Sequence, residues 1–339
     1  MLVIMRQGST DEQCDAVEEQ IRRMGYTPLP VPGENRTAIC ITGNKGAVDP
    51  ALLNQMPGVV ECIPVTKPYK LVSREVHPGD TVVRVDSVMI GGAAPTFIAG
   101  PCSVETEART LEVARRVQAA GAHIFRAGAY KPRTSPYSFQ GLGEEGLHTL
   151  KRVKDELGLP VVSEVTDASL AEKVAEHVDI LQIGARNMQN FTLLKKLGEL
   201  KRPVLLKRGI SATLEEWLMA AEYLLAEGNP DVILCERGVR TFNNHSRNTL
   251  DLNVVPLARK MTHLPVLVDP SHGVGQRDRV RPLARAGLAA GAHGLMMEVH
   301  SHPDTAYSDA HQTIDVDTFE GIVQDASILT QLEALFPAG

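Results

Sequence analysis

The feature that most constrains the fold is a regular alternation of strand-like and helix-like segments that begins at residue 96. Eight short apolar segments recur, and a stretch with helical spacing follows each of them. Continuous apolar strands that alternate with helices are typical of a parallel sheet covered on its outer face. We therefore predict an α/β chain whose residues 96–339 form a (β/α)8 barrel. The expected strands are 96–101, 123–130, 160–166, 179–184, 203–207, 232–236, 265–269 and 294–299.

The helices are expected between these strands and after the last one. Thr213 with Glu216, and Asp317 with Glu320, have the spacing of a capping box and predict two helix starts. A doubly wound open sheet is the alternative fold. It usually has fewer strands and one ligand site at its switch point, whereas polar residues here end almost every strand. The expected helices are 105–120, 144–157, 168–177, 190–199, 213–227, 247–261, 277–290 and 317–335.

Residues 1–66 follow a different order. Apolar strand-like segments are expected at 2–6, 27–31, 37–42 and 58–65, with helical segments at 10–24 and 50–56. This β-α-β-β-α-β order predicts a ferredoxin-like domain. Residues 67–95 are expected to be a linker and a short β-hairpin, because Pro and Gly cluster there before an alternating segment at 81–90.

Composition restricts the partners and the compartment. The net charge of −6 and the pI near 6.0 argue against nucleic acid, because no global basic field is present. No apolar run approaches the roughly 18 residues of a membrane helix, and the apolar start is too short for a signal peptide. The five cysteines are widely spaced and odd in number, which favours reduced thiols. We expect a soluble, cytoplasmic protein with no membrane partner.

Charged and metal-ligating side chains gather where the predicted strands end. In a (β/α)8 barrel, the carboxyl ends of all strands and the loops after them form one mouth, which holds the active site. A complete ring of such residues predicts a polar active site at that end. The ring comprises Cys102, Arg126, Lys131, Glu164, Arg186, Lys207, Arg208, Glu236, Arg237, Asp269, His272, Glu298 and His300, with Asp309 in the last loop.

Four residues of the ring predict a metal site. Cys102, His272, Glu298 and Asp309 offer a thiolate, an imidazole and two carboxylates from three neighbouring strands. Each residue alone has a structural explanation, such as packing for a lone Cys or capping for a lone His. Together they suit a divalent ion of the Mn, Fe, Co or Zn class better than Mg.

The cations of the ring predict an anionic substrate. In an acidic chain, so many cations in one mouth would repel one another unless anions were bound. Arg grips phosphate bidentately, and the hydroxyls of Thr134 and Ser135 add donors beside Arg133. Salt bridges within the protein, or a solvated basic loop at residues 131–133, are the alternatives. The cations are Arg126, Lys131, Arg133, Arg186, Lys207 and Arg237.

Seven segments of the chain resemble a known enzyme family. They are GPCS (100–103), KPRTSPYSFQGLG (131–143), QIGARNMQNF (182–191), LLKRG (205–209), CERGVRTF (235–242), LVDPSH (267–272) and GLMMEVH (294–300). In this order they resemble the metal-dependent 3-deoxy-D-arabino-heptulosonate 7-phosphate (DAHP) synthases. The pattern over 1–66 resembles the subclass that carries an N-terminal ferredoxin-like extension.

The resemblance implies an activity and a role for each site residue. The activity is the condensation of phosphoenolpyruvate with erythrose 4-phosphate and water, the first step of the shikimate pathway toward chorismate and the aromatic amino acids. Lys131, Cys102 and His272 would be catalytic. By the same resemblance, the divalent metal would be held by Cys102, His272, Glu298 and Asp309, phosphoenolpyruvate by Arg126, Lys131, Arg186, Lys207 and Arg237, and erythrose 4-phosphate by Arg133, Thr134, Ser135 and Asp269.

Two other functions stay open at this point. One is 3-deoxy-octulosonate 8-phosphate synthase, which shares the barrel and the phosphoenolpyruvate chemistry. The other is a catalytically silent barrel that acts as a sensor or scaffold.

The resemblance also implies a homotetramer and an aromatic amino acid effector at the N-terminal domain. The second strand, Pro28 to Val31, is apolar throughout, whereas a tyrosine hydroxyl would need a polar partner. We therefore expect weak or absent tyrosine inhibition, with phenylalanine or no effector as alternatives.

Overall fold

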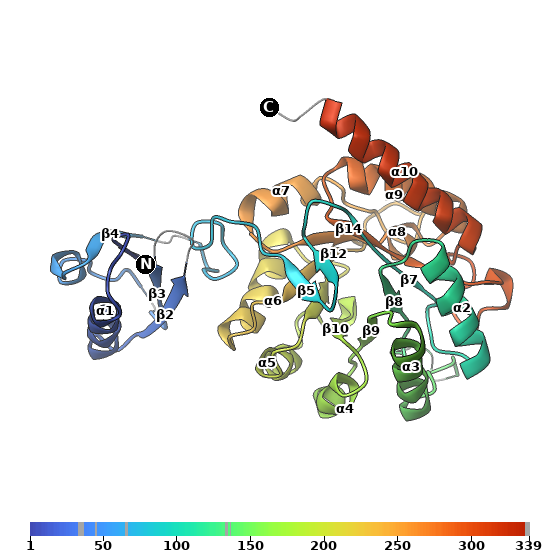
Figure 1. The fold of residues 1–339 in the computed structure, drawn as a ribbon, viewed down its shortest axis with the longest axis horizontal. Helices are drawn as coiled ribbons and strands as arrows, with labels where there is room; N and C mark the ends of the chain where they lie inside the picture. Colours follow the sequence, from blue (N-terminus) through green and yellow to red (C-terminus); the bar gives the residue numbers. More distant parts are fainter. Residues whose placement is uncertain (33–36, 45, 65–66, 133–134, 136, 336–339) are drawn as a thin grey trace. The chain divides into compact units, whose positions relative to one another are not determined.

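The computed structural model describes residues 1–32, 37–44, 46–64, 67–132, 135 and 137–335. The chain forms two compact units, drawn together in Figure 1. The first unit comprises Met1–Gly79 with the short segment Met261–His263, and the second comprises Asp80–Lys260 with Leu264–Gly339. No helix within these described ranges is both long and apolar enough to cross a membrane.

The first unit contains a four-stranded antiparallel sheet in the order β2-β3-β1-β4. Helix α1, Asp11–Arg23, begins at Thr10, whose side chain forms a capping box with Gln13. Its buried Val17 and Ile21 pack with apolar side chains of the sheet. This arrangement confirms the ferredoxin-like prediction. The strands are β1 Leu2–Met5, β2 Thr27–Pro32, β3 Thr37–Thr42 and β4 Val59–Ile63.

The second helix predicted for this unit was wrong in length. In place of a helix over 50–56, the chain makes one 3-10 turn, η1, at Leu53–Gln55. Pro57 disfavours helical geometry at Met56, and Gly58 at φ +88° starts the next segment. The buried side chain of Leu53 still supplies the core contact that a longer helix would give.

The second unit is a closed barrel of eight parallel strands, β7 to β14. Each strand pairs with its neighbours in sequence, and β14 pairs with β7 to close the ring. The (β/α)8 prediction is confirmed, and the open-sheet alternative was wrong. The strands are β7 Thr96–Gly100, β8 Ile124–Arg126, β9 Val161–Glu164, β10 Ile180–Ile183, β11 Val204–Lys207, β12 Val232–Glu236, β13 Val266–Val268 and β14 Gly294–Glu298.

Helices surround the barrel, as Figure 1 shows. The predicted start of one helix at 247 was wrong: Arg247 N–H donates to Val274 O and Thr249 N–H to Val239 O, so this segment is an irregular loop and not a helix. Asp317 was predicted to cap the last helix, and this was also wrong: the capping side chain is that of Asp315, which accepts from Thr318 N–H. The helices are α2 Glu107–Ala119, α3 Glu144–Leu157, α4 Ala171–Ala175, α5 Phe191–Glu199, α6 Leu214–Ala226, α7 Val254–Met261, α8 Pro270–Val274, α9 Val280–Ala289 and α10 Val316–Leu335.

A short hairpin fills the amino end of the barrel. Its strands are β5 Val83–Val85 and β6 Val88–Ile90. Val83, Val85 and Ile90 belong to the same buried cluster as the inward-facing strand residues, such as Ile98 and Met296. Because this end is closed by apolar packing, the opposite end is left for polar chemistry.

Candidate active site

A cavity of about 290 Å³ opens at the carboxyl ends of the strands. It brings together predicted residues from the loops after β8, β10, β12, β13 and β14. The predicted Arg133 and Thr134 lie outside the described residues. The lining residues are Lys131, Pro132, Ser135, Ser138, Glu164, Arg186, Arg237, Arg247, His272 and Asp309.

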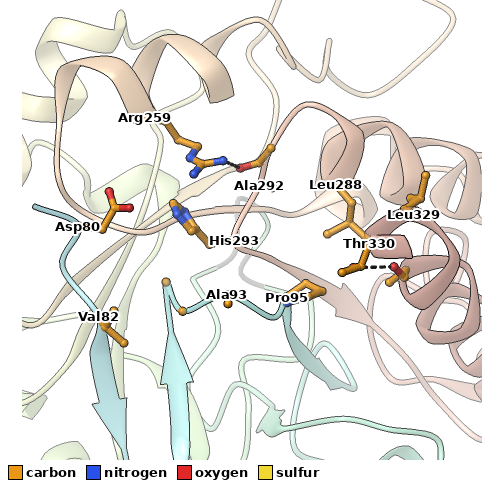
Figure 2. Close-up of a pocket in the computed structure, with 14 residues that line it drawn as sticks. Asp80, Val82, Ala93, Pro95, Arg259, Leu288, Ala292, His293, Leu329 and Thr330 are labelled. Atoms are coloured by element: carbon orange, nitrogen blue, oxygen red, sulfur yellow. Dashed lines mark hydrogen bonds between the residues drawn. The ribbon is translucent and has the colours of Figure 1, made fainter. Parts of the chain in front are cut away.

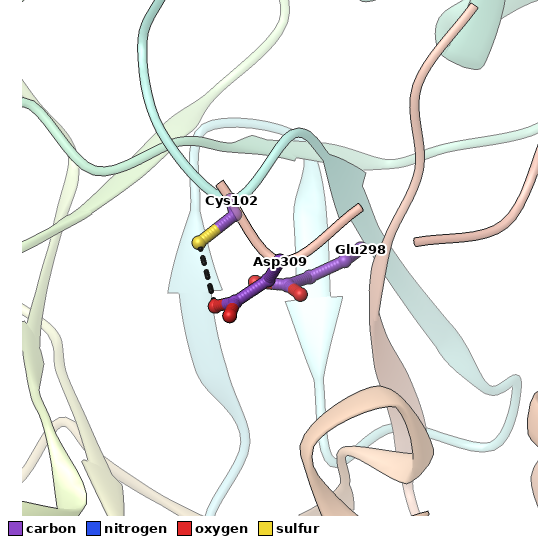
Figure 3. A group of neighbouring side chains, drawn as sticks. All are labelled: Cys102, Glu298 and Asp309. Atoms are coloured by element: carbon purple, nitrogen blue, oxygen red, sulfur yellow. Dashed lines mark hydrogen bonds between the residues drawn. The ribbon is translucent and has the colours of Figure 1, made fainter. Parts of the chain in front are cut away.

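Three of the predicted metal ligands converge beside this cavity. The ligand atoms of Cys102, Glu298 and Asp309 all lie within 4.8 Å of one another (Figure 3). The thiol of Cys102 donates to Asp309 Oδ2 at 3.1 Å. Burial, reinforced by the negative charge of Glu298, raises the pKa of the Cys102 thiol to about 12. Two carboxylates beside a buried thiol form a site that a cation would stabilise.

His272 is the fourth predicted ligand and lies next to this group. Its Nε2 is 3.3 Å from Glu298 Oε1, and its Nδ1 is 2.7 Å from Asp269 Oδ2. Burial lowers the pKa of His272, so the ring is neutral at neutral pH. With Nδ1–H donated to Asp269, the lone pair of Nε2 faces a carboxylate oxygen. A cation between these two acceptors would stabilise both, and the four side chains fit a divalent metal ion.

Glu298 is held as an anion. Its Oε1 accepts from Arg126 Nη1 at 2.9 Å, and its Oε2 accepts from Gln312 Nε2 at 2.5 Å. Burial alone would raise the pKa of Glu298, but the charge of His272, which is protonated only at low pH, and the permanent charges of Arg126 and Lys131 hold it well below its usual range. The carboxylate is thus available as a ligand at neutral pH.

Three cations around the cavity form no ion pair with a carboxylate in the described part of the chain. Among the residues that the structure describes, Lys131, Arg186 and Arg237 lie within ion-pairing distance of no carboxylate. Lys131 Nζ instead donates to the backbone oxygen of Cys102 at 2.8 Å. Three cations that share one cavity form a strong site for an anion.

Two other residues that were predicted to bind substrate, Lys207 and Asp269, form an ion pair with each other. Lys207 Nζ lies 2.5 Å from Asp269 Oδ2, and both side chains are buried. Asp269 also accepts from the backbone N–H and Nδ1 of His272. Neither Lys207 nor Asp269 lines the cavity. The structure therefore places Asp269 as the residue that orients His272, and its contact with a substrate stays a prediction.

Sequence reasoning missed Arg247 and Gln312. Arg247 lines the cavity, donates from Nη1 to Gln312 Oε1 at 2.8 Å, and lies 3.8 Å from Asp309 Oδ1. Gln312 in turn binds Glu298. Arg247 was assigned to a helix. The signal that could have identified it is an arginine flanked by polar Ser246 and Asn248, in the loop after the sixth barrel strand.

A larger cavity, of about 510 Å³, lies at the opposite end of the barrel (Figure 2). Pro95 and His293 border it just before β7 and β14, and Leu329 and Thr330 contribute from α10. Arg259 donates to Gly291 O at 2.9 Å in its wall. Since it adjoins the amino ends of the strands, it is separate from the charged mouth.

The comparison with family models decides the classification. The model of the DAHP synthetase I family matches residues 74–335, and the model of the DAHP synthase ferredoxin-like domain matches residues 1–67. The chain belongs to the DAHP synthetase I family. The resemblance seen in the seven sequence segments is thereby confirmed.

Individual relatives agree with the DAHP synthetase I assignment. The phospho-2-dehydro-3-deoxyheptonate aldolase of Thermotoga maritima is 49% identical over 325 residues, which are 96% of each chain. The crystal structure of a Thermotoga maritima DAHP synthase has a TM-score of 0.78 at 47% identity and covers 98% of this chain and 97% of its own. A truncated form has a TM-score of 0.73 at 48% identity and covers 78% of this chain and 97% of its own.

A second group of relatives shares only part of the chain. The 2-dehydro-3-deoxyphosphooctonate aldolase of Geobacter sulfurreducens is 34% identical over 261 residues, which are 71% of this chain and 95% of its own. The heptonate relative, by contrast, covers almost the whole chain. Both the identity and the coverage favour the heptonate branch.

Proposed function

We propose that the chain condenses phosphoenolpyruvate with erythrose 4-phosphate and water to give DAHP and inorganic phosphate. The observation that carries this proposal is a cavity in which Lys131, Arg186 and Arg237, none of them ion-paired to a described carboxylate, adjoin a cluster of Cys, His, Glu and Asp. The near full-length likeness to the heptonate aldolase of Thermotoga maritima supports it. The octonate relatives are less similar and match a shorter part of the chain.

Phosphoenolpyruvate carries a phosphate and a carboxylate, so it needs several cations. Lys131, Arg186 and Arg237 would bind these groups, because all three line the cavity and none is ion-paired to a carboxylate among the residues that the structure describes. Arg126 and Lys207 would add positive charge from outside the cavity lining. There, Arg126 is ion-paired with Glu298 and Lys207 with Asp269. Ion pairs of this kind would fix the position of the enol carbon atoms.

The phosphate of erythrose 4-phosphate would bind to the loop after β8. Ser135 lines the cavity, and the sequence predicts that Arg133 and Thr134 act with it. Asp269 would contribute indirectly by holding His272 through two hydrogen bonds. This arrangement would direct the aldehyde group of erythrose 4-phosphate toward the four proposed metal ligands.

Cys102, His272, Glu298 and Asp309 would hold a divalent metal ion of the Mn, Fe, Co or Zn class. A bound ion would supply Lewis acidity toward the aldehyde oxygen of erythrose 4-phosphate. Asp269 would keep the Nδ1 proton on His272, so that Nε2 remains free as a ligand atom.

The reaction forms a bond from C3 of phosphoenolpyruvate to the aldehyde carbon, adds water at C2, and then breaks the bond from C2 to the phosphate oxygen. Lys131 would stabilise negative charge that develops on the aldehyde oxygen, because its ammonium group lies beside the loop of Cys102. Glu164, which also lines the cavity, would stabilise positive charge at C2 and orient the attacking water. Lys131, Cys102 and His272 are thus the proposed catalytic residues.

The proposal divides the chain into a ferredoxin-like regulatory domain (1–66), a linker with a hairpin (67–95) and a catalytic barrel (96–339). The match of residues 1–67 to the ferredoxin-like domain of DAHP synthases supports a regulatory role, with an aromatic amino acid as the effector. We also propose a homotetramer in the cytoplasm.

Removal of the metal tests this function. Treatment with EDTA should abolish DAHP formation from phosphoenolpyruvate and erythrose 4-phosphate, and added Mn²⁺ should restore it. Full activity after exhaustive chelation, with metal content verified by elemental analysis, would contradict the assignment of the four ligands.

A further inference from the structure

One proposed metal ligand, Asp309, depends on an irregular loop. It lies between β14 and α10, where the regular structure is limited to the 3-10 turn η5 at Pro303–Thr305. The backbone of Asp309 has φ +52°, a conformation that non-glycine residues rarely adopt. Such a residue stays in place only when its surroundings constrain it strongly.

The downstream side of Asp309 is constrained by a tight turn. The carbonyl of Asp309 accepts from the backbone N–H groups of Gln312 and Thr313 and from the Thr313 hydroxyl at 3.0 Å. Ile314 N–H then donates to Glu298 O, which joins the end of the loop to β14. These bonds fix the residues after Asp309 but do not reach those before it.

The upstream side is constrained by Glu105, three residues after Cys102. Glu105 is buried, with 2% of its side chain exposed, and its Oε1 accepts from Tyr307 N–H at 2.8 Å. Its Oε2 accepts from Arg109 Nη1 at 2.7 Å. Arg109 also donates to the carbonyl and hydroxyl oxygens of Thr305. One carboxylate thus joins the start of α2 to the loop that carries Asp309.

Two further contacts join the same segments. His300 Nδ1 accepts from His302 N–H, so the ring proton lies on Nε2, which is 3.4 Å from Glu105 Oε2. The hydroxyls of Ser103 and Ser308 are 2.9 Å apart and buried. Ser103 follows Cys102 directly, and Ser308 directly precedes Asp309. The contacts therefore run from one proposed ligand to the other.

We propose that Glu105 is a positioning residue for the metal site, which sets the distance between Cys102 and Asp309 by tying their two loops together. This inference rests on the proposed metal site. Glu105 does not line the cavity, and we assign it no contact with the substrates. Without its carboxylate, the part-buried N–H of Tyr307 loses its acceptor, Arg109 loses its ion pair, and His300 Nε2 loses the anionic oxygen 3.4 Å away. The loop can then relax away from Cys102.

Cobalt binding tests the proposal, because a Co²⁺–thiolate bond absorbs light and reports Cys102 directly. Apo protein is titrated with Co²⁺ for the wild type, Glu105→Gln, Cys102→Ser and Asp179→Asn. Asp179 is a matched control at the amino end of the barrel: it is also buried and accepts from one cation, Lys154, and one backbone N–H, that of Val161. We expect Glu105→Gln to weaken Co²⁺ binding at least tenfold with a reduced thiolate band. Asp179→Asn should bind as the wild type does.

The outcomes separate this inference from the proposed function. Wild-type affinity and an unchanged band in Glu105→Gln would overturn the role of Glu105 while leaving the metal site intact. Equal losses in Glu105→Gln and Asp179→Asn would also overturn it, because the effect would then be general destabilisation. A wild type without a thiolate band would overturn the metal site and this inference together. If Glu105→Gln does not fold, Arg109→Met replaces it, because it removes the cation bound to Glu105 Oε2 together with its bonds to Thr305. A loss of about tenfold is expected, and unchanged affinity would again contradict the proposal.

Discussion

At the scale of single residues, the proposed metal site depends on groups that are remote in sequence. Cys102 and Asp309 are 207 positions apart, yet their side chains are hydrogen-bonded. We expect Cys102→Ser to reduce Mn²⁺-supported activity at least 100-fold, because a hydroxyl is a poor ligand for such ions. Steady-state rates at saturating substrate measure the effect. Cys14→Ser, on α1 of the first unit, is the control and should keep full activity.

Arg186 provides a separate test of substrate binding. It lines the cavity and forms no ion pair with any described carboxylate, so its removal leaves no buried charge unpaired. We expect Arg186→Ala to raise the KM for phosphoenolpyruvate about tenfold or more while the melting temperature is unchanged. Arg84→Ala, on the hairpin at the other end of the barrel, should leave KM unaltered. An unchanged KM in Arg186→Ala would remove this residue from the site.

The sequence predicted which residues reach the mouth but not how they pair. A residue that follows the carboxyl end of a strand must lie at that end of the barrel. This rule placed four residues correctly around one cavity: Lys131, Arg186, Arg237 and His272. It could not show that Lys207 and Asp269 neutralise each other, because pairing depends on side-chain conformations across two strands. Arg247 was missed for a related reason: its backbone N–H bonds to Val274, which is distant in sequence, so its loop does not continue as a helix.

At the scale of elements, one carboxylate joins the last two helices. Asp325 of α10 pairs with Arg281 and Arg285 of α9, and these contacts lower its pKa from 3.8 to about 2. A lowered pKa means that the stabilisation is complete above about pH 4 and is lost as the pH falls toward 2. Because both arginines are partly exposed, we expect Asp325→Asn to reduce the free energy of unfolding by only about 1 kcal/mol at pH 7.

Urea unfolding at several pH values measures this effect. The difference between wild type and Asp325→Asn should be constant from pH 7 to 5 and should shrink below about pH 4. A difference that grows as the pH falls would have the opposite sign and would exclude the ion pair as its cause.

The hairpin gives a second prediction at this scale. Ile90 is fully buried in the cluster that closes the amino end of the barrel. We expect Ile90→Ala to lower stability by about 2 to 5 kcal/mol through the cavity that it leaves. Calorimetry measures the loss. Since the active site is at the other end, kcat of the folded protein should stay within about twofold.

Elements were predictable where periodicity was long and unbroken. The strand Val232–Glu236 and the helix Glu144–Leu157 have the predicted bounds. Short elements were not: Pro50 and Pro57 leave room for one turn only, and α8, of five residues, starts at a proline directly after β13. Such segments are decided by local backbone geometry and not by an apolar pattern.

At the scale of the whole molecule, the two parts of the chain should be separable. The truncated form of the Thermotoga maritima synthase matches 78% of this chain. We expect a chain that begins at Lys67 to keep catalytic activity and to lose any response to aromatic amino acids. Initial rates with and without phenylalanine and tyrosine test this. Tyrosine should inhibit the full chain weakly or not at all, and strong inhibition at micromolar concentration would contradict the interpretation of Pro28 to Val31.

The central claim is the identity of the second substrate. Phosphate release from phosphoenolpyruvate should be measured with erythrose 4-phosphate and, in parallel, with arabinose 5-phosphate. We expect rapid release with erythrose 4-phosphate and background release with the pentose. The reverse result would assign the chain to the octonate branch of its relatives. Release with neither sugar would mean that the charged mouth of the barrel serves a different reaction.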